Sequence, residues 1–159
     1  MREKRFVMDK DLYKSVSGKF KESWHKIDSL YNLYAKSVGL NLTAIHVLEF
    51  LYDSAAVYTQ KDICEIFGLP KQSVNSIIKS LWEQSYVELK EAKDRRNKEI
   101  ILTASGIEYA KKVLKPMQAI DRKAWGSLTP SEISVFLETM KKYEKALGGI
   151  LKESLNIEP

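Results

Sequence analysis

Two groups of polar and charged residues follow one another in the sequence and suit contact with a polyanion. The first comprises Lys71, Gln72, Ser73, Asn75, Ser76 and Lys79, and the second comprises Lys93, Asp94, Arg95, Arg96 and Lys98. Amide and hydroxyl groups can donate to and accept from the edges of bases in a major groove. Extended arginine side chains suit the negative potential of a narrow minor groove. Together the two groups predict contact with double-stranded DNA.

A helix and a hairpin are the elements that must position these residues. An apolar stripe at i, i+3, i+4 and i+7 predicts a helix from about residue 71 to residue 84, with the polar residues on the opposite face. This stripe consists of Val74, Ile77, Ile78 and Leu81. Aromatic and β-branched residues predict strands at 86–89 and 99–102, joined by the basic stretch as a hairpin with Lys98 near its tip. Asp94 is expected to orient a neighbouring guanidinium by a charge-assisted hydrogen bond.

Two short helices are predicted before this helix. Thr43 is expected to cap the first, and Thr59 is expected to cap the second, which Gly68 ends. Six apolar side chains are expected to face the core from these helices: Ile45, Leu48, Leu51, Ile63, Ile66 and Phe67.

Three long helices are predicted at the two ends of the chain. One spans about residues 11–36, and one follows a Thr103 cap, with Pro116 expected to bend it. The last is opened by a capping box at residues 129–132. The first and last helices carry apolar seams: Tyr13, Val16, Phe20, Trp24, Ile27, Tyr31 and Tyr34, and Ile133, Phe136, Met140, Tyr143, Leu147 and Ile150. These seams exceed what one small module can bury, so a dimer interface is favoured.

Composition is consistent with these predictions. The 159 residues, 44% of them hydrophobic, can form one domain or a compact module with oligomerisation helices. A formal net charge of +5 favours polyanionic partners. A single cysteine, Cys64, and an N-terminal stretch without an apolar run predict a cytoplasmic protein. No uncharged stretch approaches the roughly 20 residues of a membrane-spanning helix.

Other chemistries have weaker support in the sequence. The pairs Glu22 with His25 and His46 with Glu49 supply too few ligands for a metal. Serine, histidine and aspartate are present without a nucleophile-elbow or phosphate-cradling pattern. Cys64 is expected to be a small buried residue, although a sensing role for it, His25 or His46 stays open. We therefore expect no enzyme activity, cofactor or metal. The alternatives are a metal-responsive regulator and a winged-helix protein-interaction module that does not bind DNA.

Several short motifs resemble, in their order and spacing, the MarR family of bacterial winged helix-turn-helix transcriptional regulators. These motifs are Leu42-Thr43, Thr59-Gln60-Lys61-Asp62-Ile63, Gly68-Leu69, Asp94-Arg95-Arg96, Leu102-Thr103 with Gly106, and Leu128-Thr129-Pro130-Ser131-Glu132. The resemblance implies a mainly α fold with a small β-hairpin wing, as one domain over residues 1–159. Within this domain, the winged helix-turn-helix module would span residues 42–102. The dimerisation region would consist of residues 11–38 and 103–155.

The resemblance also implies a function. A homodimer would bind a palindromic operator as a repressor, and a small aromatic or phenolic effector would release it. Such effectors commonly bind in a crevice between the dimerisation helices and the winged module. Four residues could line this crevice: Trp24, His25, Tyr31 and His46.

Individual roles follow from matching positions. Arg96 matches the arginine that enters the minor groove in the family, and Asp94 matches the acid that orients this arginine. Lys93 and Arg95 are expected to contact phosphates. The resemblance implies contacts with DNA bases for Gln72, Ser73, Asn75 and Ser76. It implies contacts with the DNA backbone for Thr59, Gln60, Lys71 and Lys79. The sequence departs from the family pattern at Pro70, where a serine cap is usual, at Ser85, where a glycine is common, and at Ala44 and His46, which replace Pro and Gln.

Overall fold

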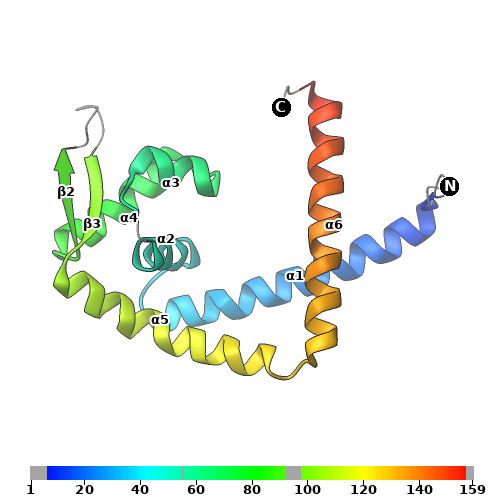
Figure 1. Ribbon diagram of the computed structural model, residues 1–159, viewed down its shortest axis with the longest axis horizontal. Helices are drawn as coiled ribbons and strands as arrows, with labels where there is room; N and C mark the ends of the chain where they lie inside the picture. Colours follow the sequence, from blue (N-terminus) through cyan, green and yellow to red (C-terminus); the bar gives the residue numbers. More distant parts are fainter. Residues whose placement is uncertain (1–6, 55, 92–97, 157–159) are drawn as a thin grey trace. The chain divides into compact units, whose positions relative to one another are not determined.

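The structure is a computed structural model that describes residues 7–54, 56–91 and 98–156. Within these ranges, the chain forms helices and a few short strands (Figure 1). The elements are α1 (Lys10–Ser37), α2 (Leu42–Asp53), β1 (Tyr58–Thr59), α3 (Gln60–Phe67), α4 (Lys71–Glu83), β2 (Val87–Glu91), β3 (Lys98–Leu102), α5 (Ala104–Trp125) and α6 (Pro130–Leu155). Each helix predicted from the sequence is present, and the mainly α fold with a small sheet is confirmed.

The chain divides into two compact units within α5. The first ends at Leu114 and the second begins at Lys115. Pro116 lies inside the helix, just after this division. Because a proline has no backbone N–H and crowds the preceding turn, it weakens the helix at this point. The bend predicted at Pro116 stays a prediction.

The core of the first unit lies where α2, α3, α4, the sheet and the start of α5 meet. Apolar side chains from each of these elements are almost fully buried: Ile45, Val47, Leu48, Ile63, Val74, Ile78, Val87, Ile100, Ala110, Val113 and Leu114. From α1, Ala35 is buried and the Tyr34 hydroxyl donates a 2.5 Å hydrogen bond to the Val113 carbonyl. The core residues predicted on α2 and α4 are therefore largely confirmed. On α3 the prediction was wrong for Ile66, which is 53% exposed.

The sheet has three antiparallel strands in the order β1-β3-β2. The predicted hairpin is confirmed as β2 and β3, paired from Val87 opposite Leu102 to Glu91 opposite Lys98. β1 was not predicted, because a two-residue strand carries no alternating pattern. It exists through its pairing with β3, in which Tyr58 lies opposite Ile100. This pairing ties the segment before α3 to the wing.

The helix caps differ in part from those predicted. Asn41, not Thr43, caps α2, and its side chain accepts from the Ala44 backbone N–H at 2.8 Å. Asparagine is the stronger N-cap residue, so the helix begins two residues earlier than expected. The capping box of α6 is confirmed, with Thr129 and Glu132 bonded reciprocally. Pro70 is the N-cap of α4 and provides no side-chain hydrogen bond.

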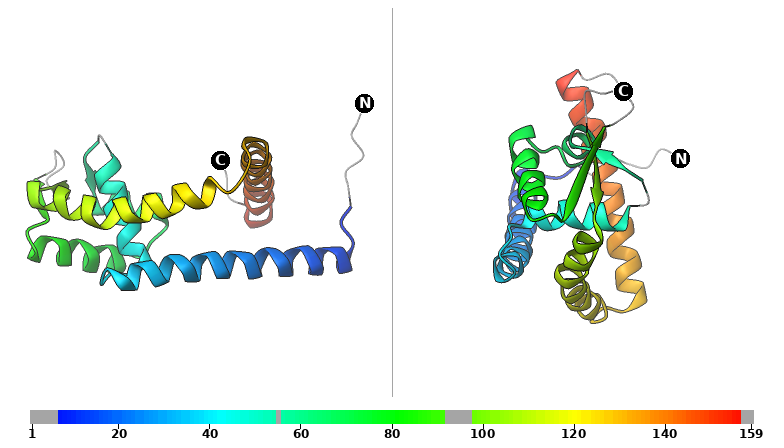
Figure 2. Two further views of the ribbon diagram at one scale, coloured as in Figure 1. Left: turned by 90° about the horizontal axis from the view of Figure 1, so that it is seen from below. Right: turned by 90° about the vertical axis from the view of Figure 1, so that its left-hand side faces the viewer.

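Long stretches of α1 and α6 remain outside any core. In α1, the seam residues from Tyr13 to Ile27 are between 43% and 58% exposed, and Figure 2 shows the N-terminal half of α1 extending beyond the other elements of its unit. In α6 no residue is buried. Throughout the described ranges, no helix combines the length and apolar character needed to cross a membrane.

Ser85 adopts a backbone conformation that normally requires glycine. Its φ is +59°, in the left-handed region, at the turn from α4 into β2. We expect Ser85→Gly to raise the free energy of unfolding by about 0.5 to 1 kcal/mol, because the steric penalty at Cβ is removed. Urea denaturation would measure this change. Gly68→Ala is the opposite control, because Gly68 has the same φ of +59°. It should lower stability, and a gain in stability from Gly68→Ala would contradict the argument.

Glu132 makes the stability of α6 depend on pH. Hydrogen bonds from the Thr129 backbone N–H and hydroxyl lower the pKa of its carboxyl below the ordinary value of 4.5. The contribution of the carboxylate is therefore fully present above pH 4.5 and is lost as the pH falls through the lowered pKa. We expect Glu132→Gln to be less stable than wild type at neutral pH and equally stable in acid. Urea denaturation across this pH range would test it, and a constant difference would contradict it.

Candidate nucleic-acid interface

The polar face of α4 is open to solvent, as the apolar stripe predicts. Val74, Ile78 and Leu81 are buried against the core. All six candidate contact residues on this helix are exposed: Lys71, Gln72, Ser73, Asn75, Ser76 and Lys79. Lys79 forms an exposed ion pair of 3.7 Å with Glu83, one turn along the same helix. Such a pair contributes little stability and leaves the ammonium group available to a phosphate.

A groove of about 530 Å³ lies beside this face, where α3, α4 and the strands β2 and β3 meet. Its lining residues are Gln60, Lys61, Cys64, Glu65, Lys71, Asn75, Leu89 and Lys98. Three of these are lysines from three different elements, and the groove therefore has an excess of positive charge. Across it, the Gln60 side-chain amide donates a 3.3 Å hydrogen bond to the Asn75 side-chain oxygen. Sequence reasoning had named both residues as separate contacts and had missed the bond between them.

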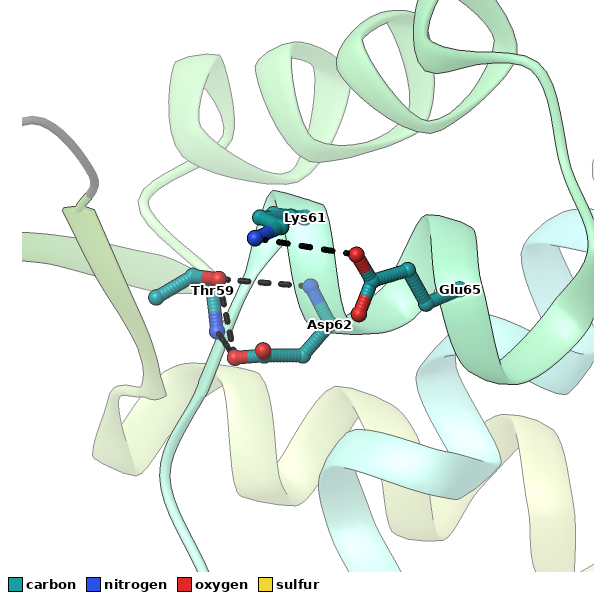
Figure 3. Close-up of polar contacts among 4 residues, drawn as sticks. All are labelled: Thr59, Lys61, Asp62 and Glu65. Atoms are coloured by element: carbon teal, nitrogen blue, oxygen red, sulfur yellow. Dashed lines mark hydrogen bonds and ion pairs between the residues drawn. The ribbon is translucent and has the colours of Figure 1, made fainter.

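The start of α3 is held by a capping box (Figure 3). The Thr59 backbone N–H and hydroxyl both donate to the Asp62 carboxylate, at 2.7 and 2.8 Å. The Asp62 N–H donates to the Thr59 hydroxyl oxygen at 3.3 Å. A threonine hydroxyl has one proton to donate. A phosphate contact through that proton would therefore require the cap to open, whereas Gln60 and Lys61 already face the groove.

The strands of the wing are longer than predicted. Lys90 and Glu91 belong to β2, and Lys98 belongs to β3, so the strands extend further into the basic stretch than expected. Lys98, predicted near the hairpin tip, is the first residue of β3; it pairs with Glu91 next to the connection and also lines the groove. The other predicted wing residues, Lys93, Asp94, Arg95 and Arg96, lie outside the described residues.

Two of the residues considered for sensing line different depressions: Cys64 lines the groove beside α4, and His46 does not. His46 lies in a depression that is also lined by Glu49, Phe50 and Phe67. Trp24 and His25 are exposed on α1, and neither lines this depression. Glu22 forms an ion pair with Lys26 at 2.6 Å. Among the described residues, no group of three metal-ligating side chains lies together.

This geometry defines a class of protein. A helix with an exposed polar face follows a short, capped helix and precedes an antiparallel hairpin, which is the arrangement of a winged helix-turn-helix protein. The sequence of residues 38–97 matches the profile described as the MarR family. Comparison with curated protein sequences gives no match.

Solved structures of MarR-family proteins have the same fold. AbsC, a MarR family transcriptional regulator from Streptomyces coelicolor, matches with a TM-score of 0.74 at 18% identity, over 92% of this chain and 99% of that one. NMB1585, a MarR family regulator from Neisseria meningitidis, matches with a TM-score of 0.65 at 25% identity, over 86% of this chain and 98% of that one. MepR in its complex with DNA, from Staphylococcus aureus, matches with a TM-score of 0.69 at 20% identity, over 82% of this chain and 96% of that one. The chain therefore has the fold of MarR-family proteins, and its residues 38–97 resemble that family in sequence.

Proposed function

We propose that the protein is a transcriptional regulator that binds double-stranded DNA through α4, the groove beside it and the wing. The observation that carries this proposal is the exposed polar face of α4 bordering a groove with Lys61, Lys71 and Lys98. Short polar side chains suit base edges, and the surrounding ammonium groups suit the phosphates. The MepR–DNA complex, which has the same fold, supports the proposal.

The regulator acts as a homodimer on a palindromic operator. The exposed apolar seams of α1 and α6 support this assembly, because such seams are stable when another protein surface buries them. In a two-fold dimer the α4 helices would occupy successive major grooves about 34 to 36 Å apart. Repression of the target gene, and release by a small aromatic or phenolic effector, follow from the family resemblance. An effector weakens DNA binding if it binds more tightly to a dimer whose α4 helices have the wrong spacing for DNA. The loss of DNA affinity cannot exceed the difference between the effector's affinities for that conformation and for the DNA-binding one.

A gel-shift experiment with the DNA flanking the protein's own gene tests this proposal. We expect Arg96→Ala to weaken binding about tenfold, because a charged contact in the minor groove is lost while the fold is unchanged. Lys145→Ala, an exposed change on α6 outside the proposed interface, serves as the charge-matched control and should bind as wild type. Unchanged binding by Arg96→Ala would contradict the wing assignment. No shift with any duplex would instead favour a winged-helix protein-interaction module.

A further inference from the structure

The hydrogen bond between Gln60 and Asn75 joins the two helices of the helix-turn-helix. Gln60 is the first residue of α3, and Asn75 lies in the second turn of α4. The Gln60 Nε2 group donates to Asn75 Oδ1 at 3.3 Å, although the two residues are 15 positions apart in the chain. Both side chains line the basic groove, and Asn75 is exposed on the proposed DNA-contacting face.

The bond determines which end of the Asn75 amide can turn towards DNA. A side-chain amide has an oxygen that accepts and an NH₂ group that donates two hydrogen bonds. With its oxygen directed at Gln60, Asn75 presents its NH₂ group away from α3. The usual two-point contact with adenine requires the oxygen and the nitrogen to face the same base edge, because the oxygen accepts from N6 while the nitrogen donates to N7.

We propose that Gln60 is a specificity-determining residue, which fixes the Asn75 amide so that Asn75 presents N–H donors, and not its oxygen, to the bases. This inference rests on the proposed function, because it describes how the same surface would read sequence. The bases that fit such a residue are those with acceptors alone on the accessible edge. Guanine fits best, because its major-groove edge offers the N7 and O6 acceptors side by side.

The surroundings of the pair favour this role. The groove contains Lys61, Lys71 and Lys98, which would draw the phosphate backbone over it. Once DNA covers the groove and displaces water, a hydrogen bond inside it becomes stronger than in the exposed protein. Glu65 also lines the groove but pairs with Lys61 at 3.7 Å. It therefore offers a comparison site that shares the groove without holding Asn75.

The test is a selection of duplexes from a random library by the full-length protein at one salt concentration. Comparison with Asn75→Ala identifies the base position whose discrimination depends on Asn75. Two changes at the partner residue then act differently. Gln60→Leu has a similar size and removes the donor, whereas Gln60→Glu accepts from Asn75 and should turn its amide over. Glu65→Gln is the matched control, and circular dichroism confirms the fold of every variant.

The wild-type protein should prefer guanine to adenine at the position assigned to Asn75. Gln60→Leu should reduce this preference about tenfold, which is within the discrimination that one good base contact provides. Gln60→Glu should shift the preference towards adenine or cytosine, whose edges carry donors. Glu65→Gln should leave the preference unchanged. The quantity compared is the ratio in which two bases are selected at the position assigned to Asn75. A new negative charge lowers affinity for all duplexes alike and leaves this ratio unchanged, so the two effects can be separated.

Two results would overturn the inference and can be told apart. A clear selected motif that prefers adenine at the Asn75 position, or that is unchanged by both Gln60 variants, would contradict the role of Gln60 and leave the proposed function intact. Failure of the wild-type protein to enrich any motif would overturn both the inference and the proposed function.

Discussion

Gly106→Ala is expected to lower the free energy of unfolding by about 3 kcal/mol or more, which is at the upper end of overpacking effects. A Cβ atom at this position would lie 1.9 Å from the carbonyl oxygen of Tyr86 and 2.8 Å from its carbonyl carbon. These are backbone atoms, so no side-chain rotation can relieve the clash. The same carbonyl oxygen accepts from the Thr103 N–H at 3.0 Å. The start of α5 would therefore have to move away from the turn before β2.

The packing around Gly106 shows what this movement would disrupt. The rings of Tyr86 and Tyr109 stack with their centres 4.1 Å apart. Partial burial, and then the proximity of Tyr86, raise the pKa of Tyr109 above its ordinary value. Loss of this stack would expose both rings.

Urea denaturation of Gly106→Ala would measure the effect, with Gly18→Ala as the matched control. No atom outside the local backbone lies within 4 Å of a Cβ built at Gly18, on the exposed side of α1. The same substitution there should raise stability by up to about 1 kcal/mol, as expected for Gly to Ala in a helix. A Gly106→Ala protein as stable as wild type would contradict the close approach of α5 to Tyr86.

The second large effect is expected from Ile27→Asp, which should separate the proposed homodimer into monomers of 18.3 kDa. Ile27 is 52% exposed in the middle of the α1 seam. A carboxylate there would be buried without a partner in the dimer, which is strongly unfavourable. DNA affinity should fall about 100-fold, because the two half-sites would no longer be bound by one linked molecule. Sedimentation equilibrium and a DNA titration would measure the two quantities.

Ser29→Asp is the charge-matched control for this experiment. It introduces the same carboxylate two residues away, on the side of α1 opposite the seam, where Ser29 is exposed. The control should remain dimeric and bind DNA close to the wild-type affinity. A dimeric Ile27→Asp protein, or loss of the dimer in both variants, would contradict the assignment of this seam to the subunit interface.

Features encoded by nearby residues were predictable from the sequence. The capping box of α6 depends on Thr129 and Glu132, three positions apart, and the core face of α4 depends on a four-residue stripe. The cap of α2 was missed because Asn41 and Thr43 are both good N-cap residues. A local pattern could not decide between them. The structure decides, through the bond from the Ala44 N–H to Asn41.

Features that depend on distant pairing were not predictable in the same way. β1 is a strand only because Tyr58 and Thr59 pair with Ile100 and Glu99. The bond between Gln60 and Asn75 requires α3 and α4 to be folded against each other, and no spacing in the sequence indicates it. Ser85 was noted as a departure from a family glycine. Its φ of +59° gives the physical reason why glycine suits that turn.

The most direct test of the account is the ratio of affinities for the selected operator and for a scrambled duplex, measured by fluorescence anisotropy over a series of salt concentrations. Both affinities should fall as the salt concentration rises, because lysines and arginines replace counterions on DNA. The logarithm of the affinity should fall linearly with the logarithm of the salt concentration, with a slope of about −0.9 for each phosphate contact. The operator should bind at least about 1,000-fold more tightly than the scrambled duplex. Equal affinity for the two duplexes at every salt concentration would contradict sequence-specific recognition by α4.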